Sequence, residues 1–584
     1  MELQIGYDDF GEVRTNQLNF VDKTLFIKEV IDSKNIKVSV ITRPRRFGKT
    51  FNLSALHYFL APEVNQIKTK KLFDSLKIAE TDNGSYMQYQ GKFPVIFISF
   101  KGVKAENYDV AYSKLYTLIV NVFNEYDYLE QSDKLSKNDK KMFQRILNKK
   151  ANHAEIEDSL SFLTAILFKY YGVKPWLLID EYDTPIQAGY LHNYYKEIVG
   201  LMRGMFGAAL KTNPYLERAV ITGVLRVAKE SLFSGLNNVV VYSLLQPEYS
   251  QHFGFTEGEV SDLLMQANMI DKETEVKKWY NGYVFGGRVV YNPWSIANYL
   301  SSSELLKPYW VNTSDNHLIK TLLIESNTEF KKQFELLLQD KTIEKSIDEN
   351  MVFGDLKNNS QAAWSLLVMS GYLKPITTTL IEGITRCALA IPNFEVKVLY
   401  RTIVQGWLSN GHGTDWYQSF LTYLLDGDIA RFVENFGQVL AQTISVHDVA
   451  HNPEAFYHGF MLGLAAGLDQ KQYELKSNRE SGTGRYDIVI IPKNISKPAI
   501  ILEIKSIVPP KLSKRKAAEF LDITLTQEAQ KALEQINRNQ YTFELMQRGF
   551  TNIVKIGLAF SGKSFRVASE KNNRQKIENQ KEVS

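Results

Sequence analysis

Short apolar runs alternate with longer stretches of helical character along the first 245 or so residues. This alternation is typical of an α/β domain built on a parallel sheet. The predicted strands are 37–42, 93–100, 175–180, 218–223 and 238–244. Between the second and third of them, the polar stretch 131–150 predicts a helical insert.

The pattern changes twice in the rest of the chain. Residues 246–400 are predicted to be mostly helical, with aromatic-rich turns such as "KKWYNGYVFGG" and "VYNPWSIANYL". Residues 401–567 begin with helices and continue as a second α/β region, whereas 568–584 has few apolar residues and is predicted to be a disordered tail. The elements expected in the second region are strands at 471–476, 485–491, 498–505 and 553–560, and a helix at about 524–547.

Composition limits the classes of protein. The 584 residues are 44% hydrophobic and 23% charged, which is ordinary for a globular protein of several domains. A net charge of +4 is too small to argue for nucleic acid from the whole chain. The single cysteine, Cys387, excludes an internal disulfide framework and a Cys-rich zinc site.

The chain shows no targeting or membrane signal. Its first segment, "MELQIGYDDFGEV", is acidic and lacks the apolar core of a signal peptide. No apolar run reaches about 18 residues, the length that a membrane span needs. We therefore expect a soluble, cytoplasmic protein without a membrane partner.

The segment "ITRPRRFGKT" (41–50) joins a predicted strand to a predicted helix and ends like a phosphate-binding loop. The usual pattern is G-x-x-x-x-G-K-[ST]. Gly48, Lys49 and Thr50 match its end, but Arg43 holds the first glycine position. The helix N-terminus would supply N–H groups, Lys49 a charge for the β- and γ-phosphates, and Thr50 a hydroxyl for Mg²⁺. Arg43, Arg45 and Arg46 would contact phosphates or a partner's acid, or would form a solvated basic loop.

Two further strand ends carry polar residues. "WLLIDEYD" places Asp180 and Glu181 where a Walker B strand has its metal-holding carboxylate and its water-orienting glutamate. The alternative is a buried strand whose terminal acids are only solvated. "VITGVLRVAKES" places Thr222 at a strand end and Arg226 shortly after it, as a sensor of the γ-phosphate would be. A strand cap followed by a surface arginine is an equal alternative.

These motifs together resemble the AAA-ATPase-like family, over residues 1 to about 315. The resemblance rests on "NFVDKTLFI", "ITRPRRFGKT", "LLIDEYDTPI", "ITGVLRVAKESLFSGLNN", "FGFTEGEV", "WYNGYVFGG" and "YNPWSI". It implies that Lys49 and Thr50 bind phosphate and Mg²⁺, that Asp180 and Glu181 are the Walker B pair, and that ATP is the ligand. It also implies an N-terminal element near the nucleotide, with Asp22 and Lys23.

The C-terminal region carries a second cluster of charged residues. Glu503 and Lys505 are two apart on one predicted strand, so they share a face, and a neighbouring strand can bring Asp487 beside them. Two adjacent carboxylates need a cation, and Mg²⁺ suits oxygen ligands. Such an ion could activate a water toward a phosphodiester, with Lys505 orienting that water or stabilising charge. An edge-strand ion pair is the plainer alternative.

This region resembles the PD-(D/E)XK nuclease-like domain that often follows the ATPase-like domain in bacterial proteins. The matching segments are "FYHGFMLGL", "SNRESGTGRYDIVI" and "AIILEIK". The resemblance implies that Glu454 is a helix-borne metal ligand beside Asp487 and Glu503, and that Gln535 lies on a later helix near the site. From residue 497 onward, 16 lysine and arginine residues face 9 acidic ones, a net charge of +7 that suits a polyanion.

The remaining candidates are weaker. His57 is expected to pack rather than to react. His458 follows Glu454 by one helical turn and could border the metal site, but a hydrogen-bonded residue of a helix face is favoured. The aromatic residues of the middle turns could stack bases, but packing between domains is favoured. These residues are Trp279, Tyr280, Tyr283 and Trp294.

The sequence therefore predicts three folded parts: a P-loop domain, a mostly helical middle region and a nuclease-like α/β domain. We expect binding and hydrolysis of ATP with Mg²⁺, and nucleotide-gated, Mg²⁺-dependent cleavage of nucleic acid, DNA in particular. The alternative is a nucleotide-dependent switch or scaffold that binds nucleic acid or protein without cutting it. The sequence leaves open whether the protein forms a homo-oligomer.

Overall fold

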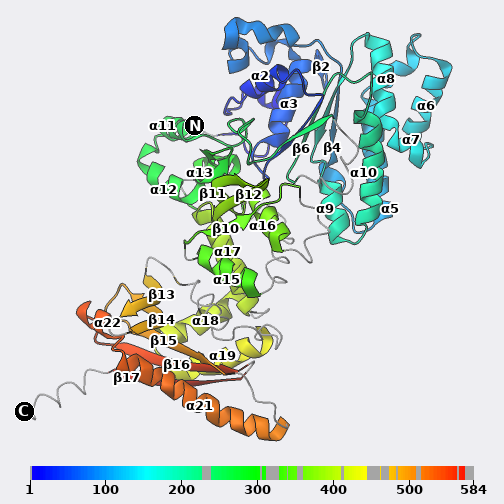
Figure 1. Cartoon of the computed structure of the whole chain (residues 1–584). Helices are drawn as coiled ribbons and strands as arrows, with labels where there is room; N and C mark the ends of the chain where they lie inside the picture. The colour runs from blue at the N-terminus through cyan, green and yellow to red at the C-terminus, as the bar shows by residue number, and fades with distance from the viewer. Residues whose placement is uncertain are drawn as a thin grey trace, which may run out of the picture. The chain divides into compact units, whose positions relative to one another are not determined.

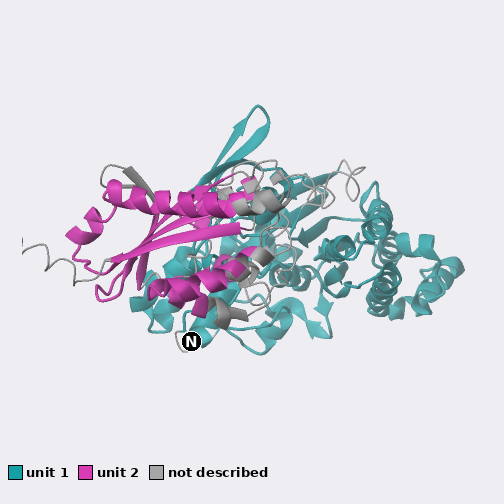
Figure 2. Cartoon of the chain, turned by 90° about the horizontal axis from the view of Figure 1, so that it is seen from below, with its two compact units in different colours: residues 1–322, 342–397 teal, residues 323–341, 398–584 magenta. Residues whose placement is uncertain are grey.

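The computed structural model describes residues 3–225, 238–302, 305–310, 328–338, 340–350, 360–409, 413–443, 461, 468, 472–481, 484–507, 514–561 and 564–572. The chain forms two compact units, shown in Figure 2. The first comprises Met1–Leu322 and Thr342–Lys397, and the second comprises Leu323–Lys341 and Val398–Ser584. The predicted boundary near 400 lies close to this division, whereas the predicted boundary at 245 falls inside the first unit.

A five-stranded parallel sheet forms the centre of the first unit (Figure 1). Its strand order is β4-β5-β6-β1-β7, so β6 lies between β1 and β5. All five strands were predicted, and three of them are buried along their whole length. In sheet order the strands are β4 (Val95–Ser99), β5 (Trp176–Asp180), β6 (Ala219–Gly223), β1 (Val38–Thr42) and β7 (Val239–Tyr242). Because the strands are parallel, their carboxyl ends meet at one edge of the sheet.

Helices cover both faces of this sheet. In Figure 1, α2 and α3 lie on one side of the strands and α5, α8 and α10 on the other. The predicted polar insert is confirmed as α6, which has a Ser136–Asp139 capping box at its start. The helices are α2 (Leu25–Asp32), α3 (Lys49–Leu60), α5 (Tyr108–Asn124), α6 (Lys137–Leu147), α8 (Ser159–Tyr171) and α10 (Tyr195–Leu210).

The middle region is largely helical, as predicted, but it also contains strands that the sequence pattern did not reveal. Its helices are α11 (Glu257–Gln266), α12 (Glu273–Tyr280), α13 (Pro293–Ser301) and α16 (Ser360–Met369). Its strands are β8 (Tyr283–Phe285), β9 (Arg288–Val290), β10 (Ile343–Ser346), β11 (Lys374–Ile381) and β12 (Ile384–Ala390). Most side chains of β11 are exposed, so no alternation of apolar and polar residues marks it as a strand.

The second unit contains a mixed five-stranded sheet in chain order (Figure 1). Only β15 and β16 pair in parallel, and α21 (Lys514–Arg538) connects them. The strands are β13 (Tyr473–Ser481), β14 (Gly484–Pro492), β15 (Ala499–Ser506), β16 (Ile553–Ser561) and β17 (Ser564–Asn572). The other helices are α15 (Thr328–Leu338), α17 (Phe394–Ser409), α18 (Gly413–Leu425), α19 (Ile429–Thr443) and α22 (Phe543–Gln547).

One part of the predicted tail is wrong. Residues 568–572 belong to β17, which pairs with β16 from Ser564 to Asn572. This polar edge strand is held by backbone hydrogen bonds, which composition does not reveal. Residues 573–584 lie outside the described residues. Across the described parts of the chain, no helix is both long enough and apolar enough to span a membrane.

Arg43 anchors the loop that joins β1 to α3. Its side chain is fully buried, and its guanidinium donates to the carbonyl oxygens of Thr42 (2.8 Å), Tyr242 (3.0 Å) and Glu248 (2.9 Å). The same group lies 5.4 Å from the ring centre of Phe253 and 5.5 Å from that of Phe285. Burial lowers the pKa of Arg43 to about 9, so the side chain stays charged at neutral pH.

The middle region packs against the same loop. The ring of Phe47 lies 4.9 Å from the rings of both Tyr283 and Phe285, measured between centres. The indole N–H of Trp310 donates to the carbonyl oxygen of Arg45 at 3.1 Å. These contacts explain why residues beyond 245 form one compact unit with the parallel sheet.

We predict that Arg43→Gly, which restores the glycine of the usual loop pattern, destabilises the protein. The change removes a buried cation and leaves three carbonyl groups without this donor. We expect it to lower the free energy of unfolding by about 3–5 kcal/mol. Urea unfolding of the full chain measures it. Arg45→Gly is the matched control, because it makes the same change two positions later, where the side chain is only half-buried. Equal stability of Arg43→Gly and the wild type would contradict the anchoring role.

Candidate functional site

The start of α3 has the geometry of a phosphate-binding helix N-terminus. Gly48 precedes the helix with φ of 81°, a left-handed conformation that glycine adopts readily. Lys49 is the first helical residue, and its Nζ donates to the carbonyl oxygen of Pro44 at 2.9 Å. Burial lowers the pKa of Lys49, while the nearby carboxylates of Glu181, Asp180 and Asp183 act in the opposite direction. The lysine is thus a poorly solvated cation at the positive end of a helix.

A buried carboxylate joins three predicted site residues. Asp180, at the end of β5, is fully buried and accepts hydrogen bonds from the hydroxyls of Thr50 (2.8 Å) and Thr222 (2.6 Å). Burial raises the pKa of Asp180, although these two hydroxyl donors oppose the shift. The three residues meet because the strand that carries Thr222 lies between β1 and β5. An oxygen-rich cluster of this kind suits a hard divalent cation such as Mg²⁺.

Glu181 has a strained backbone next to this cluster. Its φ is 50°, which is uncommon for a residue with a side chain. The carboxylate accepts a hydrogen bond from the hydroxyl of Thr184 at 3.1 Å. Such strain is often found at functional positions, because it fixes the direction of a side chain.

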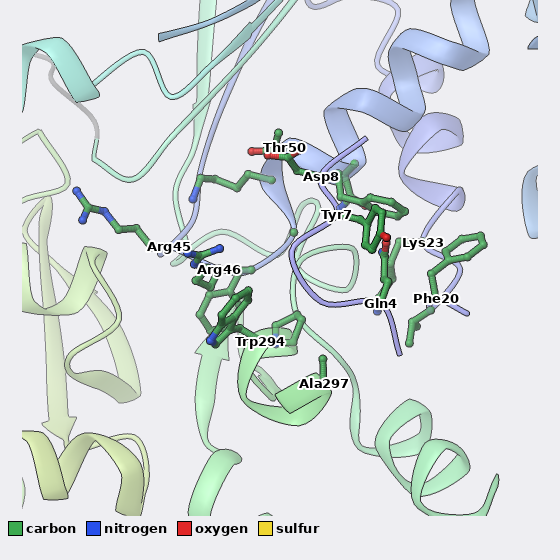
Figure 3. Close-up of a pocket in the computed structure, with 18 of the residues that line it drawn as sticks. Gln4, Tyr7, Asp8, Phe20, Lys23, Arg45, Arg46, Thr50, Trp294 and Ala297 are labelled. Carbon is green, nitrogen blue, oxygen red and sulfur yellow. The ribbon is translucent and has the colours of Figure 1, made fainter. Parts of the chain in front are cut away.

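Lys49, Thr50 and Glu181 line a pocket of about 340 Å³, shown in Figure 3, whereas Asp180 and Thr222 are not part of its lining. One part of its lining comes from the loop, α3 and Glu181, and the rest comes from the N-terminal segment, α13, residues near 252–255, Lys101 and Lys104. The guanidinium of Arg46 lies 4.1 Å from the ring centre of Trp294, and both residues line the pocket. Burial lowers the pKa of Arg46. The predicted residues in the lining are Arg46, Gly48, Lys49, Thr50 and Glu181, together with Arg45.

Some expected residues lie elsewhere. Arg43 does not line the pocket, and its guanidinium is occupied by backbone carbonyl groups, so the expected phosphate contact is corrected to a structural role. Lys23 does line the pocket, but its Nζ donates to Glu259 at 2.6 Å. Asp22 accepts the backbone N–H groups of Thr24 and Lys77, each at 2.8 Å. Arg226 lies outside the described residues.

Sequence reasoning missed Asp183. It is buried, and its carboxylate accepts the backbone N–H groups of Val224 (3.0 Å) and Leu225 (2.9 Å). Burial raises the pKa of Asp183. Asp183 therefore fixes the segment that leaves β6 just before Arg226. The only signal in the sequence was a third acid in "LLIDEYD".

Two aromatic expectations have different outcomes. The ring of His57 stacks on that of Phe97 at 5.3 Å, and burial lowers the pKa of His57 to about 4, so packing is confirmed. Trp294 was interpreted as interdomain packing, yet it lies in the pocket lining beside Arg46. The strand–helix context of the loop did not point to it, because Trp294 is about 250 residues away in sequence.

The C-terminal unit brings Asp487, Glu503 and Lys505 to one place. Ile488 pairs with Leu502 in the antiparallel β14–β15 ladder, so the next step brings Asp487 opposite Glu503. Asp487 accepts the backbone N–H of Ile504 at 2.7 Å. The Nζ of Lys505 lies 3.6 Å from Glu503 Oε1, which also accepts a hydrogen bond from Gln535 on α21. The expected place of Gln535 on a later helix beside the site agrees with this contact.

Glu503 is the most perturbed carboxyl group of this cluster. Only 2% of the residue is exposed, and burial, followed by the charge of Asp487, raises the pKa of Glu503 to about 8. Its Oε2 is buried and has no hydrogen-bond partner among the described residues. An unpaired carboxylate oxygen beside a second carboxylate is chemically suited to a divalent cation.

The set of possible metal ligands is incomplete in the described part of the chain. Within the described ranges, no group of three or more histidine, cysteine, aspartate or glutamate residues could hold a metal ion. Glu454, the expected third carboxylate, and the neighbouring His458 lie outside those ranges. Asp487 and Glu503 are therefore the two described members of the expected set of three ligands.

The two sites define a P-loop nucleotide-binding domain followed by a nuclease-like domain. Residues 4–233 match the family described as predicted AAA-ATPase. Residues 452–570 match the PD-(D/E)XK nuclease superfamily. The chain therefore contains an AAA-ATPase-like domain and a PD-(D/E)XK nuclease-superfamily domain, and both expected resemblances are confirmed.

One relative covers most of the chain. It is the "Uncharacterized protein in vnfD 5'region" of Azotobacter chroococcum mcd 1. The two are 27% identical over 507 residues, which are 84% of this chain and 87% of the relative. The printed name of this relative gives no activity.

We predict that Glu503→Gln stabilises the metal-free protein at pH 8 but not at pH 4.5. The pKa of Glu503 is about 8 in the folded state, above its ordinary value of 4.5. Below pH 4.5 the group is protonated in both the folded and the unfolded protein, so its burial costs no free energy of ionisation. Above pH 8 it is ionised in both, and the folded protein bears the full cost of burying the charge. The wild type should therefore lose stability relative to the variant as the pH rises through this window, by on the order of 3 kcal/mol. Urea unfolding in EDTA measures the difference.

Two controls sharpen this test. Glu534→Gln changes an exposed glutamate of α21 and should show no such pH window. Adding Mg²⁺ at pH 8 should stabilise the wild type more than Glu503→Gln, because a bound cation offsets the buried charge. A variant no more stable than the wild type at pH 8 in EDTA would show that burial does not penalise Glu503.

Proposed function

We propose that the first unit binds and hydrolyses ATP and that the second cleaves phosphodiester bonds of nucleic acid, DNA in particular, under control of the bound nucleotide. The observation that carries the ATPase part is the convergence of Lys49, Thr50, Asp180 and Glu181 beside a pocket at the start of α3. The nuclease part rests on the Asp487–Glu503–Lys505 cluster.

Each residue of the first site would have a distinct role in ATP hydrolysis. Lys49 and the N–H groups of the α3 start would hold the phosphates. Thr50 and Asp180 would hold Mg²⁺, which neutralises phosphate charge when bound. Glu181 would orient the attacking water and take up its proton. Thr222, through its hydrogen bond to Asp180, and Arg226 would respond to the γ-phosphate.

The second site would use a divalent cation held by Asp487, Glu503 and Glu454. Bound there, Mg²⁺ would polarise the phosphodiester and make a bound water more acidic. Lys505 would orient that water or stabilise the charge that develops on the phosphate. Gln535 would hold Glu503 in position through its hydrogen bond to Oε1. The basic C-terminal sequence favours a polyanionic substrate.

A chain of hydrogen bonds supports control by nucleotide. Buried Glu395 accepts the backbone N–H of Trp310 at 2.6 Å and the hydroxyl of Ser295 at 2.8 Å. The indole of Trp310 donates to the carbonyl oxygen of Arg45 in the phosphate loop. Ser295 follows Trp294, which lies against Arg46. Glu395 thus reaches the pocket lining only indirectly, through Trp310, which contacts Arg45, and through Ser295, which follows Trp294.

Glu395 also lies near the start of the helix that joins the units along the chain. Helix α17 begins at Phe394 in the first unit, and its residues from Val398 onward belong to the second. A change in the loop on nucleotide binding would therefore act on the first turn of this helix. This supports control of the nuclease-like domain by nucleotide through α17. Such control requires that α17, or its contacts with the first unit, can adopt two conformations.

We predict that Lys49→Ala weakens ATP binding by about tenfold to a hundredfold, because it removes a charge-assisted contact to phosphate. Glu181→Gln should bind ATP normally but lose on the order of 100-fold in turnover. Titration calorimetry and phosphate release measure the two effects. Lys92→Ala, at an exposed position, is the control. Unchanged ATP turnover in Lys49→Ala would refute the ATPase assignment.

We predict that Lys505→Ala lowers Mg²⁺-dependent cleavage of DNA by on the order of 100-fold, because it removes a cation from the reacting site. Assays with labelled DNA and RNA, with and without ATP and Mg²⁺, measure the effect. Lys531→Ala alters an exposed lysine of α21 and serves as the matched control. If wild type and Lys505→Ala behave alike, the domain binds without cutting, and the switch or scaffold function replaces the nuclease.

The same assay tests gating with Glu395→Gln. The variant should bind ATP and cleave DNA without nucleotide as the wild type does, since Glu395 is in neither site. Its cleavage should no longer respond to ATP, because the amide pairs more weakly with the two donors. Glu434→Gln, an exposed change on α19, should retain the response. A full ATP response in Glu395→Gln would exclude this route.

A further inference from the structure

Away from the phosphate loop, part of the pocket lining is apolar. This part lies between the N-terminal segment and α13, and its apolar lining residues are Leu3, Val21, Phe255 and Ala297. All four belong to, or pack against, one hydrophobic cluster of the first unit. Apolar lining next to a phosphate-binding loop is suited to the less polar part of a ligand, such as an aromatic ring.

Gln4 is a polar exception in this lining. Its Oε1 is buried and has no hydrogen-bond donor among the described residues. Leaving a buried acceptor unpaired costs about 1–3 kcal/mol, so a ligand that supplies a donor recovers that cost. The backbone N–H of Gln4 donates to the carbonyl oxygen of Asn19 at 3.2 Å, which holds the residue in place.

The neighbouring polar side chain is already occupied. Lys23 donates to Glu259 and to the carbonyl oxygen of Gln251, at 2.6 Å and 2.8 Å. Figure 3 shows Gln4 and Phe20 across the pocket from Trp294 and Ala297, with Thr50 at another end. Thr50 marks the place of the phosphates, so the Gln4 side is suited to the opposite end of a nucleotide.

We propose that Gln4 recognises the nucleobase and accepts a hydrogen bond from the exocyclic amine of adenine. This rests on the proposed binding of nucleotide in the pocket. Adenine carries a donor, its 6-amino group, where guanine carries the acceptor O6. With Oε1 turned toward the base, Gln4 therefore favours the amine of adenine over O6 of guanine. Gln4 is thus a specificity-determining residue rather than a catalytic one.

The test combines one substitution with one change in the ligand. Competition binding on the full chain compares ATP, GTP and the triphosphate of purine riboside, which lacks the 6-amino group. The wild type should prefer ATP over the purine analogue by about tenfold, the equivalent of one hydrogen bond. Gln4→Met, similar in size but without the amide, should bind ATP and the analogue equally. The pair of changes isolates the contact between Gln4 and the amine.

Each outcome decides the matter. Gln144→Leu, at an exposed position of α6, should leave the ratio of affinities unchanged. A wild type that binds ATP and the purine analogue equally would overturn the role of Gln4 and leave nucleotide binding intact. The same holds if Gln4→Met keeps the wild-type preference. A wild type that binds none of the three ligands would overturn the proposed function, and this inference with it.

Discussion

The phosphate loop depends on one buried cation. The guanidinium of Arg43 is enclosed by Phe253 and Phe285 and donates to the carbonyl groups of the last residues of β1 and β7 and of Glu248 at the start of the middle region. A charge removed from water is stable only with such partners. Because they come from segments about 200 residues apart, the loop can take its shape only when the middle region is in place.

Because the loop is held by distant segments, the pocket beside it is lined by parts of the chain that are far apart in the sequence. Glu181, which directly follows β5, lines the pocket together with Lys49 and Thr50 of α3, and Thr50 is hydrogen-bonded to Asp180 at the end of that strand. The opposite wall comes from α13 and from the N-terminal segment, which lie far from the loop in sequence. A ligand in the pocket would therefore touch both the sheet and the region that leads toward α17.

In the second unit, the electrostatic cost comes from two neighbouring carboxyl groups. Asp487 and Glu503 are opposite each other on β14 and β15, and burial holds the pKa of Glu503 near 8. Lys505 and Gln535 both contact Oε1 of Glu503. Its Oε2 is buried and has no hydrogen-bond partner among the described residues. The domain therefore carries a cost that a proton or a cation can relieve.

The sequence by itself determined the five strands of the parallel sheet and the positions of Asp180 and Thr222 at two of the strand ends. Apolar runs fix strands, and parallel strands bring their ends to one edge. It also placed Glu503 and Lys505 on one face, because side chains alternate along a strand. The family motifs added the identity of both domains, which the family matches confirm.

Only the tertiary structure decided the role of Arg43, the buried position of Asp183 and the place of Trp294 and Gln4 in the pocket. Each depends on partners or pocket neighbours that are distant in sequence, so no local pattern could reveal it. The strands β11 and β17 also depend on the tertiary structure. Their residues are exposed or polar, and they form strands because a neighbouring strand pairs with them. Local periodicity reports burial, whereas hydrogen-bond partners are set by how the chain folds back on itself.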